Sequence, residues 1–215
     1  MTNTAQGELE TSLYFPTPLY SITRNDFIPT VTTVFDEYIA KSIENTPIND
    51  LHPSVMTYDM SQDERLKDFN SYILGTAYNI LVSQGHRMDN QVPFFHSIWG
   101  QEHHKTSDMP EHIHNEGVQI IGFYFINAPD GSSPMIVHDP RYGKRQINLP
   151  AIKPEEISFA SRAIVFKPKQ GMFVFANSWL PHSFGRHNSD KPFKFIHFNI
   201  GLQQFNPQCD APTVI

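Results

Sequence analysis

Cysteine is nearly absent from this sequence, which has Cys209 as its only one among 215 residues. A lone thiol cannot form an internal disulfide and does not make a zinc cluster, so we expect it to have no chemical role. The fold must therefore be stabilised by an apolar core. Hydrophobic residues make up 39% of the chain and Phe occurs 17 times, which is enough for such a core and too much for a disordered chain.

Long apolar runs and runs of one charge are also absent. No stretch approaches the roughly 18 consecutive apolar residues of a membrane-spanning helix, and the start MTNTAQGELETS lacks the basic end and apolar centre of a secretory signal. We therefore expect a soluble, cytoplasmic protein without a membrane partner. The 16 basic and 22 acidic residues leave a formal charge of -6 with no long run of Lys and Arg, which argues against nucleic acid as a partner.

Helical periodicity is confined to the first part of the chain. Residues 12–20 contain two prolines, which predicts a lone strand at an edge or an extended segment. Apolar residues then recur at three- and four-residue spacing over 26–45, which predicts a helix. A second helix is predicted from a capping box at Ser61 and Glu64 to Gly85, where a left-handed C-cap would lie.

Beyond residue 91 the apolar period shortens to about two residues, which is typical of strands. Seven short strands are predicted, separated by turn-forming clusters: Pro93–Trp99, Val118–Asn127, Pro134–Val137, Lys144–Leu149, Arg162–Phe166, Gly171–Phe175 and Phe193–Leu202. Strands of this length and spacing indicate a β-sandwich or barrel. Because both helices precede the strands, we expect an α+β fold that is mainly β, with the helices covering one face of a sheet.

Histidine is the unusual residue type, with 11 in the chain and six between residues 86 and 114. In an extended backbone His112, His114 and Glu116 project from one face, just before a strongly apolar strand. The neighbouring His103 and His104 would point to opposite faces of any strand, so we predict them to be loop residues. A single histidine is more often hydrogen-bonded than metal-bound, but a near pair followed by a distant third indicates a metal site.

His182 is the distant candidate, one loop after the predicted strand Gly171–Phe175. Two imidazoles and one carboxylate on one face of an octahedron suit Fe(II) and leave three positions open for a co-substrate and dioxygen. The residues alone leave two near pairs open, His112 with His114 or His114 with Glu116.

Four segments in this order resemble the 2-oxoglutarate- and Fe(II)-dependent oxygenases, in particular the small prolyl-hydroxylase-like group of marine bacteria and phages. The segments are HIHNEGVQIIGFYF, HDPR at 138–141, PKQGMFVFANSWLPHSF, and FKFIHFN at 193–199, and the resemblance covers about residues 93–200. It implies a double-stranded β-helix, a jelly roll of the cupin kind, with two N-terminal helices packed on the larger sheet. We expect one domain over 1–215, with a supporting part at 1–90 and the β-helix core at 91–205.

The resemblance also implies an activity and a set of site residues. The protein would be an Fe(II)- and 2-oxoglutarate-dependent dioxygenase that hydroxylates a prime substrate with dioxygen and releases succinate and CO2. His182 matches the distal iron ligand. The near pair is either His112 with His114, which ranks slightly ahead, or His114 with Glu116, and no catalytic residue is implied beyond the metal centre.

In this family the distal carboxylate of 2-oxoglutarate normally meets an Arg or Lys about ten residues after the distal His. The sequence has no Arg there, so Lys194 is the best candidate, with Lys191 and Arg186 behind it, and Tyr124 would add a hydroxyl. Two alternatives stay open: a cupin-like metalloprotein that acts without 2-oxoglutarate, and a catalytically silent jelly-roll binding module. A homodimer is also possible through the tail QQFNPQCDAPTVI.

Overall fold

Two antiparallel sheets face each other in the computed structural model, which describes residues 10–114 and 116–205. The strands are β1 (Leu19–Thr23), β2 (Ser54–Met56), β3 (Gln91–His103), β4 (Met109–His112), β5 (Val118–Asn127), β6 (Met135–His138), β7 (Ala163–Phe166), β8 (Met172–Asn177), β9 (His182–Phe184) and β10 (Phe193–Gln204). The larger sheet has the order β1-β8-β5-β10-β3-β2 and the smaller one β4-β9-β6-β7. This alternation of chain segments between two facing sheets is the predicted double-stranded β-helix, which is confirmed.

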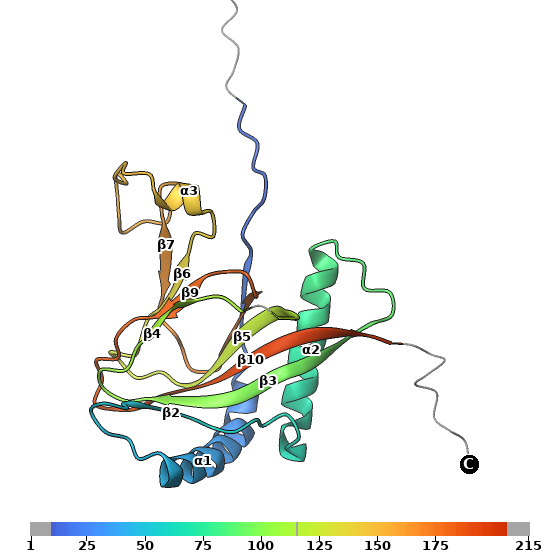
Figure 1. Cartoon of the computed structure of the whole chain (residues 1–215), viewed down its shortest axis with the longest axis vertical. Coiled ribbons are helices and arrows are strands. Elements are labelled where there is room, and N and C mark those ends of the chain that lie inside the picture. Colours follow the sequence, from blue (N-terminus) through green and yellow to red (C-terminus); the bar gives the residue numbers. More distant parts are fainter. Residues whose placement is uncertain (1–9, 115, 206–215) are drawn as a thin grey trace, which may run out of the picture.

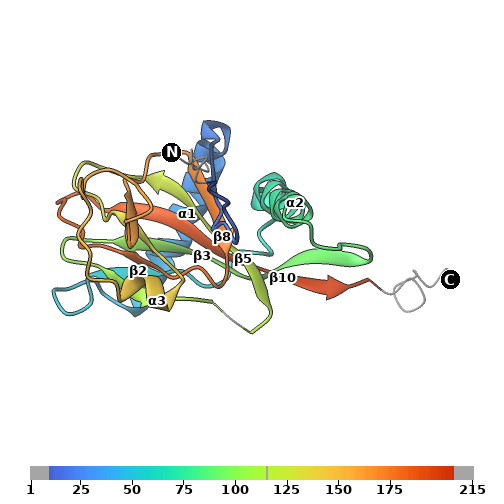
Figure 2. The same ribbon diagram turned by 90° about the horizontal axis from the view of Figure 1, so that it is seen from above.

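Two helices cover the outer face of the larger sheet, as predicted (Figure 1). They are α1 (Ile28–Asn45) and α2 (Lys67–Ser83), and short 3-10 turns over Asn25–Phe27 and Glu64–Leu66 precede them. Figure 2 shows α1 and α2 on one side of β3, β5 and β10, with the short helix α3 (Tyr142–Arg145) on the other. No helix of the described residues is long and apolar enough to cross a membrane.

The helices form because each presents one apolar stripe to the sheet. Val31, Val34, Phe35 and Ile39 of α1 are buried at helical spacing. At Gly100 of β3 an added Cβ would lie 2.6 Å from Cε2 of Phe35, so only glycine allows α1 to approach the sheet this closely. The main core therefore lies between the helices and the sheet.

A second core fills the space between the two sheets and is rich in aromatic residues. The strand β10 divides its side chains strictly between the two cores, because successive residues of a strand face opposite ways. Ile196, Phe198 and Ile200 pack toward the helices, whereas Phe193 and Phe195 pack between the sheets. This alternation decides which residues of β10 can reach a site inside the β-helix.

Several expectations about the elements are wrong. The predicted strand Lys144–Leu149 is the helix α3 followed by irregular chain, and its apolar residues have no buried face, since Leu149 is 76% exposed. The first strand is not alone, because β1 pairs with β8 at the edge of the larger sheet. The predicted capping box does not cap α2, which follows Leu66 without a side-chain cap; Asp63 caps the preceding 3-10 turn, where its side chain accepts a hydrogen bond from the backbone N–H of Arg65. Gly85 does have the expected positive φ, 86°.

Candidate metal centre

Three histidine side chains converge at one end of the β-helix. His112 ends β4 and pairs in register with His182, the first residue of β9, while His114 follows two residues after β4. One ligand nitrogen from each of the three lies within 4.8 Å of the others. The ring centroids are 4.4 Å apart for His112 and His182, and 5.3 Å apart for His114 and His182.

Backbone carbonyls fix the orientation of two of these rings. The Nδ1–H of His112 donates to the carbonyl oxygen of Pro110 at 2.9 Å, and the Nδ1–H of His182 donates to that of Leu180 at 3.0 Å. A carbonyl can only accept, so each proton must sit on Nδ1 and each Nε2 is left with a lone pair. Such backbone partners are how proteins usually orient metal-binding imidazoles.

Two of the three imidazoles, those of His114 and His182, are neutral and lack a hydrogen-bond partner on Nε2 among the described residues. Nε2 of His114 and Nε2 of His182 are buried without a hydrogen-bond partner in the described part of the chain, a state that costs about 1–3 kcal/mol per group. Burial, with a smaller effect of the neighbouring imidazoles, lowers the pKa of His182 to about 3 and the pKa of His114 to about 4. Neutral imidazoles with bare, converging lone pairs fit a divalent metal ion.

Glu116 lies outside this group. After His114 the backbone leaves the extended conformation, and Glu116 has a φ of 56° in an exposed turn. The alternation that would have aligned its carboxylate with the imidazoles therefore ends before it. The geometry brings together the all-imidazole set and not the pair of His114 with Glu116.

His197 is a fourth imidazole at the centre that the sequence reasoning missed. It lies on the inner face of β10, with its ring centroid 5.1 Å from that of His114 and stacked on Phe123 at 4.4 Å. Its Nδ1–H donates to the carbonyl oxygen of Gly122 at 2.9 Å. Complete burial lowers its pKa well below the ordinary value, so it is neutral. The alternation in FKFIHFN was the signal that places it on the same face as Phe195.

The two residues expected to bind 2-oxoglutarate, Tyr124 and Lys194, face the helices and not the space between the sheets, so both expectations are wrong. The hydroxyl of Tyr124 donates to the carbonyl oxygen of Arg24 at 2.7 Å, on the helix side of the larger sheet. The Nζ of Lys194 lies 2.8 Å from Oδ1 of Asp36 on α1 and 3.4 Å from Oε2 of Glu102. Both residues occupy outward positions of their strands, so neither side chain reaches the space between the sheets. The reserve candidates Lys191 and Arg186 are exposed in the loop before β10.

Polar residues behind the histidines tie the strands of the smaller sheet together. Arg145 of α3 donates to both carboxylate oxygens of Glu111 at 2.7 Å each, and this ion pair lowers the pKa of the Glu111 carboxyl. His138 of β6 forms a hydrogen bond through Nε2 to Oγ of Ser183 at 2.9 Å. Glu111 and Ser183 directly neighbour two of the histidines, so this network stabilises the strands that position them.

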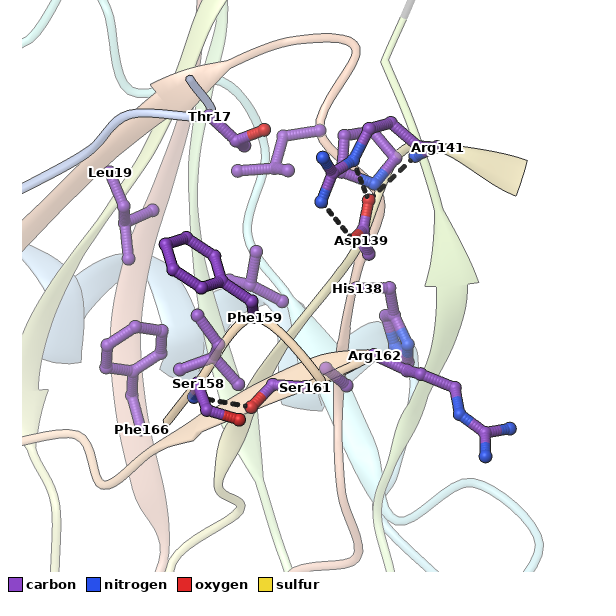
Figure 3. A pocket seen from close by; sticks show the side chains of 15 residues that line it. Thr17, Leu19, His138, Asp139, Arg141, Ser158, Phe159, Ser161, Arg162 and Phe166 are labelled. Atoms are coloured by element: carbon purple, nitrogen blue, oxygen red, sulfur yellow. Dashed lines mark hydrogen bonds and ion pairs between the residues drawn. The ribbon is translucent and has the colours of Figure 1, made fainter. Parts of the chain in front are cut away.

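A cavity of about 180 Å³ opens beside the centre, between the free edge strands β1 and β7 (Figure 3). Its lining is mainly apolar and includes Leu19, Phe159 and Phe166. Leu180 also lines the cavity, and its carbonyl oxygen is the one that orients His182. The cavity and the histidine centre therefore share a wall.

The charged groups of this cavity sit at its rim. In the HDPR segment at 138–141, Arg141 pairs locally with both carboxylate oxygens of Asp139, at 2.9 and 2.7 Å. The side chain of Arg162 is directed away from the cavity in Figure 3. The cavity thus offers an apolar floor with charges only at its edge.

Residues 97–199 match the model of a family described as "Putative 2OG-Fe(II) oxygenase". This range contains all four histidines of the centre, and the match confirms the resemblance to the 2-oxoglutarate- and Fe(II)-dependent oxygenases. No curated protein matches the chain.

Solved structures are similar to the chain in fold at low sequence identity. The viral collagen prolyl hydroxylase vCPH from Paramecium Bursaria Chlorella virus-1, a 2OG complex, is 11% identical with a TM-score of 0.54, covering 85% of this chain and 94% of its own. HygX from Streptomyces hygroscopicus, with nickel, 2-oxoglutarate and hygromycin B bound, is 11% identical with a TM-score of 0.55, covering 86% and 83%. A Pseudomonas putida prolyl-4-hydroxylase is 8% identical with a TM-score of 0.55, covering 86% and 92%.

Proposed function

We propose that this chain, whose residues 97–199 carry the core of a 2OG-Fe(II) oxygenase, is an Fe(II)- and 2-oxoglutarate-dependent dioxygenase that hydroxylates a prime substrate. The observation that carries the proposal is the convergence of three imidazoles inside the matched region. His112, His114 and His182 would hold the metal. Fe(II), 2-oxoglutarate and dioxygen bound there would together supply the oxidation of a C–H bond, with release of succinate and CO2.

The protein's own residues orient the ligands and exclude water. The carbonyl oxygens of Pro110 and Leu180 keep two imidazoles in the tautomer that a metal requires. Phe123 and the stacked His197 close the centre on the side of the larger sheet. The cavity next to Leu180 would receive an apolar part of the prime substrate, because its lining is mainly apolar.

The remaining expectations about partners and location enter the proposal at this point. We propose a prime substrate that is a small molecule or a protein and not a nucleic acid, in keeping with the net charge of -6, and a cytoplasmic location. A homodimer through the C-terminal tail stays a proposal too, because residues 206–215, with Cys209, lie outside the described residues.

Anaerobic titration of the Fe(II)-loaded protein with 2-oxoglutarate tests the proposal. Chelation through the 2-oxo and carboxylate groups produces a weak visible charge-transfer band, and we expect the band to saturate at one equivalent. His182→Ala should abolish it, while the control His86→Ala, at an exposed position just after α2, should leave it unchanged. Bound iron without any band would instead support the cupin-like metalloprotein, and no bound iron would support a silent binding module.

A further inference from the structure

The space between the two sheets contains no cationic side chain. All 16 Lys and Arg residues lie in the part of the chain that the structure describes, and none of them is buried. The four that are half-buried are held elsewhere: Arg24 by Asp26, Lys144 by the carbonyl oxygen of Ala160, Arg145 by Glu111, and Lys194 by Asp36. A carboxylate inside the β-helix would find no positive partner.

Aromatic rings occupy the inward positions instead. On β10 the residues that face inward before His197 are Phe193 and Phe195, both fully buried. Phe195 stacks on Phe184 of β9 at 5.2 Å, and Phe123 of β5 meets the His182 ring edge-on at 5.6 Å. The aromatic lining therefore begins next to the histidine centre and continues inward.

Two polar side chains on the neighbouring strand β3, those of Trp99 and His103, are neutral. Trp99, in register with His197, has a buried Nε1 without a partner in the described residues. His103 forms a hydrogen bond through Nε2 to Oε1 of Gln101, and burial lowers its pKa to about 4, so it carries no charge near neutral pH. Burying a carboxylate against neutral groups and aromatic rings is unfavourable unless a cation compensates for the lost hydration.

We propose that this protein recognises its co-substrate by the 2-oxo acid head alone, and that five-carbon 2-oxo acids with an uncharged tail bind as well as 2-oxoglutarate or better. The inference rests on the proposed function, since the head would chelate the same metal. Phe193 and Phe195 set this selectivity, because they occupy the inward positions of the strand on which Lys194 faces outward.

The arginines at the rim of the neighbouring cavity do not replace an internal cation. Arg141 is already paired with Asp139, and Arg162 is exposed and directed away from the cavity (Figure 3). Water and salt screen such exposed charges, so they add little binding energy for a carboxylate.

The test compares 2-oxoglutarate with 2-oxopentanoate, which has a methyl group where 2-oxoglutarate has its distal carboxylate. Both are titrated anaerobically into the Fe(II)-loaded wild-type protein, and the charge-transfer band gives the two dissociation constants. We expect values within about threefold of each other, or tighter binding of 2-oxopentanoate. Binding of 2-oxoglutarate more than about tenfold tighter overturns the inference and leaves the proposed function standing. No band with either acid refutes the proposed function and the inference with it.

Variants of two adjacent residues of β10 test whether this strand determines the preference between the two acids. Phe193→Arg places a cation at an inward position and should shift the preference toward 2-oxoglutarate by about tenfold or more. The matched control Lys194→Met, at the adjacent outward position, should leave the ratio of dissociation constants unchanged. A ratio that changes with Arg162→Ala would show that the carboxylate is recognised at the rim, which contradicts the inference. The wild-type ratio decides the question even where Phe193→Arg fails to fold.

Discussion

Replacing His182 by leucine separates a metal ligand from a structural histidine. In the metal-free protein His182 donates one hydrogen bond, to Leu180, and leaves Nε2 buried without a partner. His182→Leu loses the hydrogen bond, worth about 0.5–1.5 kcal/mol, but removes a desolvation penalty of about 1–3 kcal/mol. His197→Leu loses an equivalent hydrogen bond, to Gly122, without that relief. We therefore expect metal-free His182→Leu to be more stable than metal-free His197→Leu by about 1–3 kcal/mol.

Urea unfolding in the presence of a chelator measures the free energy of unfolding of both variants. A second series measures the same free energies with Fe(II) under anaerobic conditions. A ligand at 100 times its dissociation constant stabilises the native state by about 2.7 kcal/mol, so this series shows which variants still bind iron. Wild type and His197→Leu should gain this stability and His182→Leu should not. The reasoning is refuted if metal-free His182→Leu is the less stable of the two, or if it keeps the stabilisation by iron.

Three further predictions concern the fold around the centre. Lys194→Met removes the cation beside the carboxylate of Glu102, which is 7% exposed and keeps its hydrogen bond from Nε2 of His104, and should lower the free energy of unfolding by about 1.5–3 kcal/mol in urea unfolding. Gly100→Ala forces a Cβ to within 2.6 Å of the Phe35 ring and should cost about 1–3 kcal/mol in the same assay, with no change if α1 can shift freely. Burial lowers the pKa of His103 to about 4 from an ordinary 6.5, so the unfolded chain binds more protons between these values and stability falls as the pH falls through this window, by about 1.4 kcal/mol per pH unit. His114, His182 and His197 have lowered pKa values too, so His103→Gln should make the pH dependence of the metal-free protein less steep between pH 7 and pH 5 by at most about 1.4 kcal/mol per pH unit, without abolishing it. An unchanged slope would contradict this origin.

The long helices and strands could be predicted from the sequence, whereas the short strands could not all be predicted. The strand Val118–Asn127 and both helices follow from sustained apolar periods, which report burial on one face directly. The strands β4 and β9 have four and three residues, too few to show a period, and they are held by pairing with each other and with β6, from segments distant in the sequence. The wrongly predicted strand over 144–149 had an apolar pattern without any partner surface to bury it.

At the centre, residue type, order and strand alternation together indicated the histidines, whereas alternation was not applied to the residues expected to bind 2-oxoglutarate. The spacing of His112 and His114 and the distant His182 correctly indicated three groups that meet. Lys194 and Tyr124 were chosen by residue type, although the alternation of their strands already placed them opposite the inward residues His197 and Phe123. Glu116 could join the metal ligands only if the backbone stayed extended beyond His114. The sequence did not show where the extended backbone ends, because the fold determines it.

The central claim is that His112, His114 and His182 share a single metal ion. Anomalous diffraction at the iron edge, from crystals loaded with Fe(II) without oxygen, tests it most directly. The account predicts one strong peak within about 2.0–2.2 Å of Nε2 of all three imidazoles. A peak elsewhere, or one coordinated by the carboxylate of Glu116 in place of His112, would contradict it.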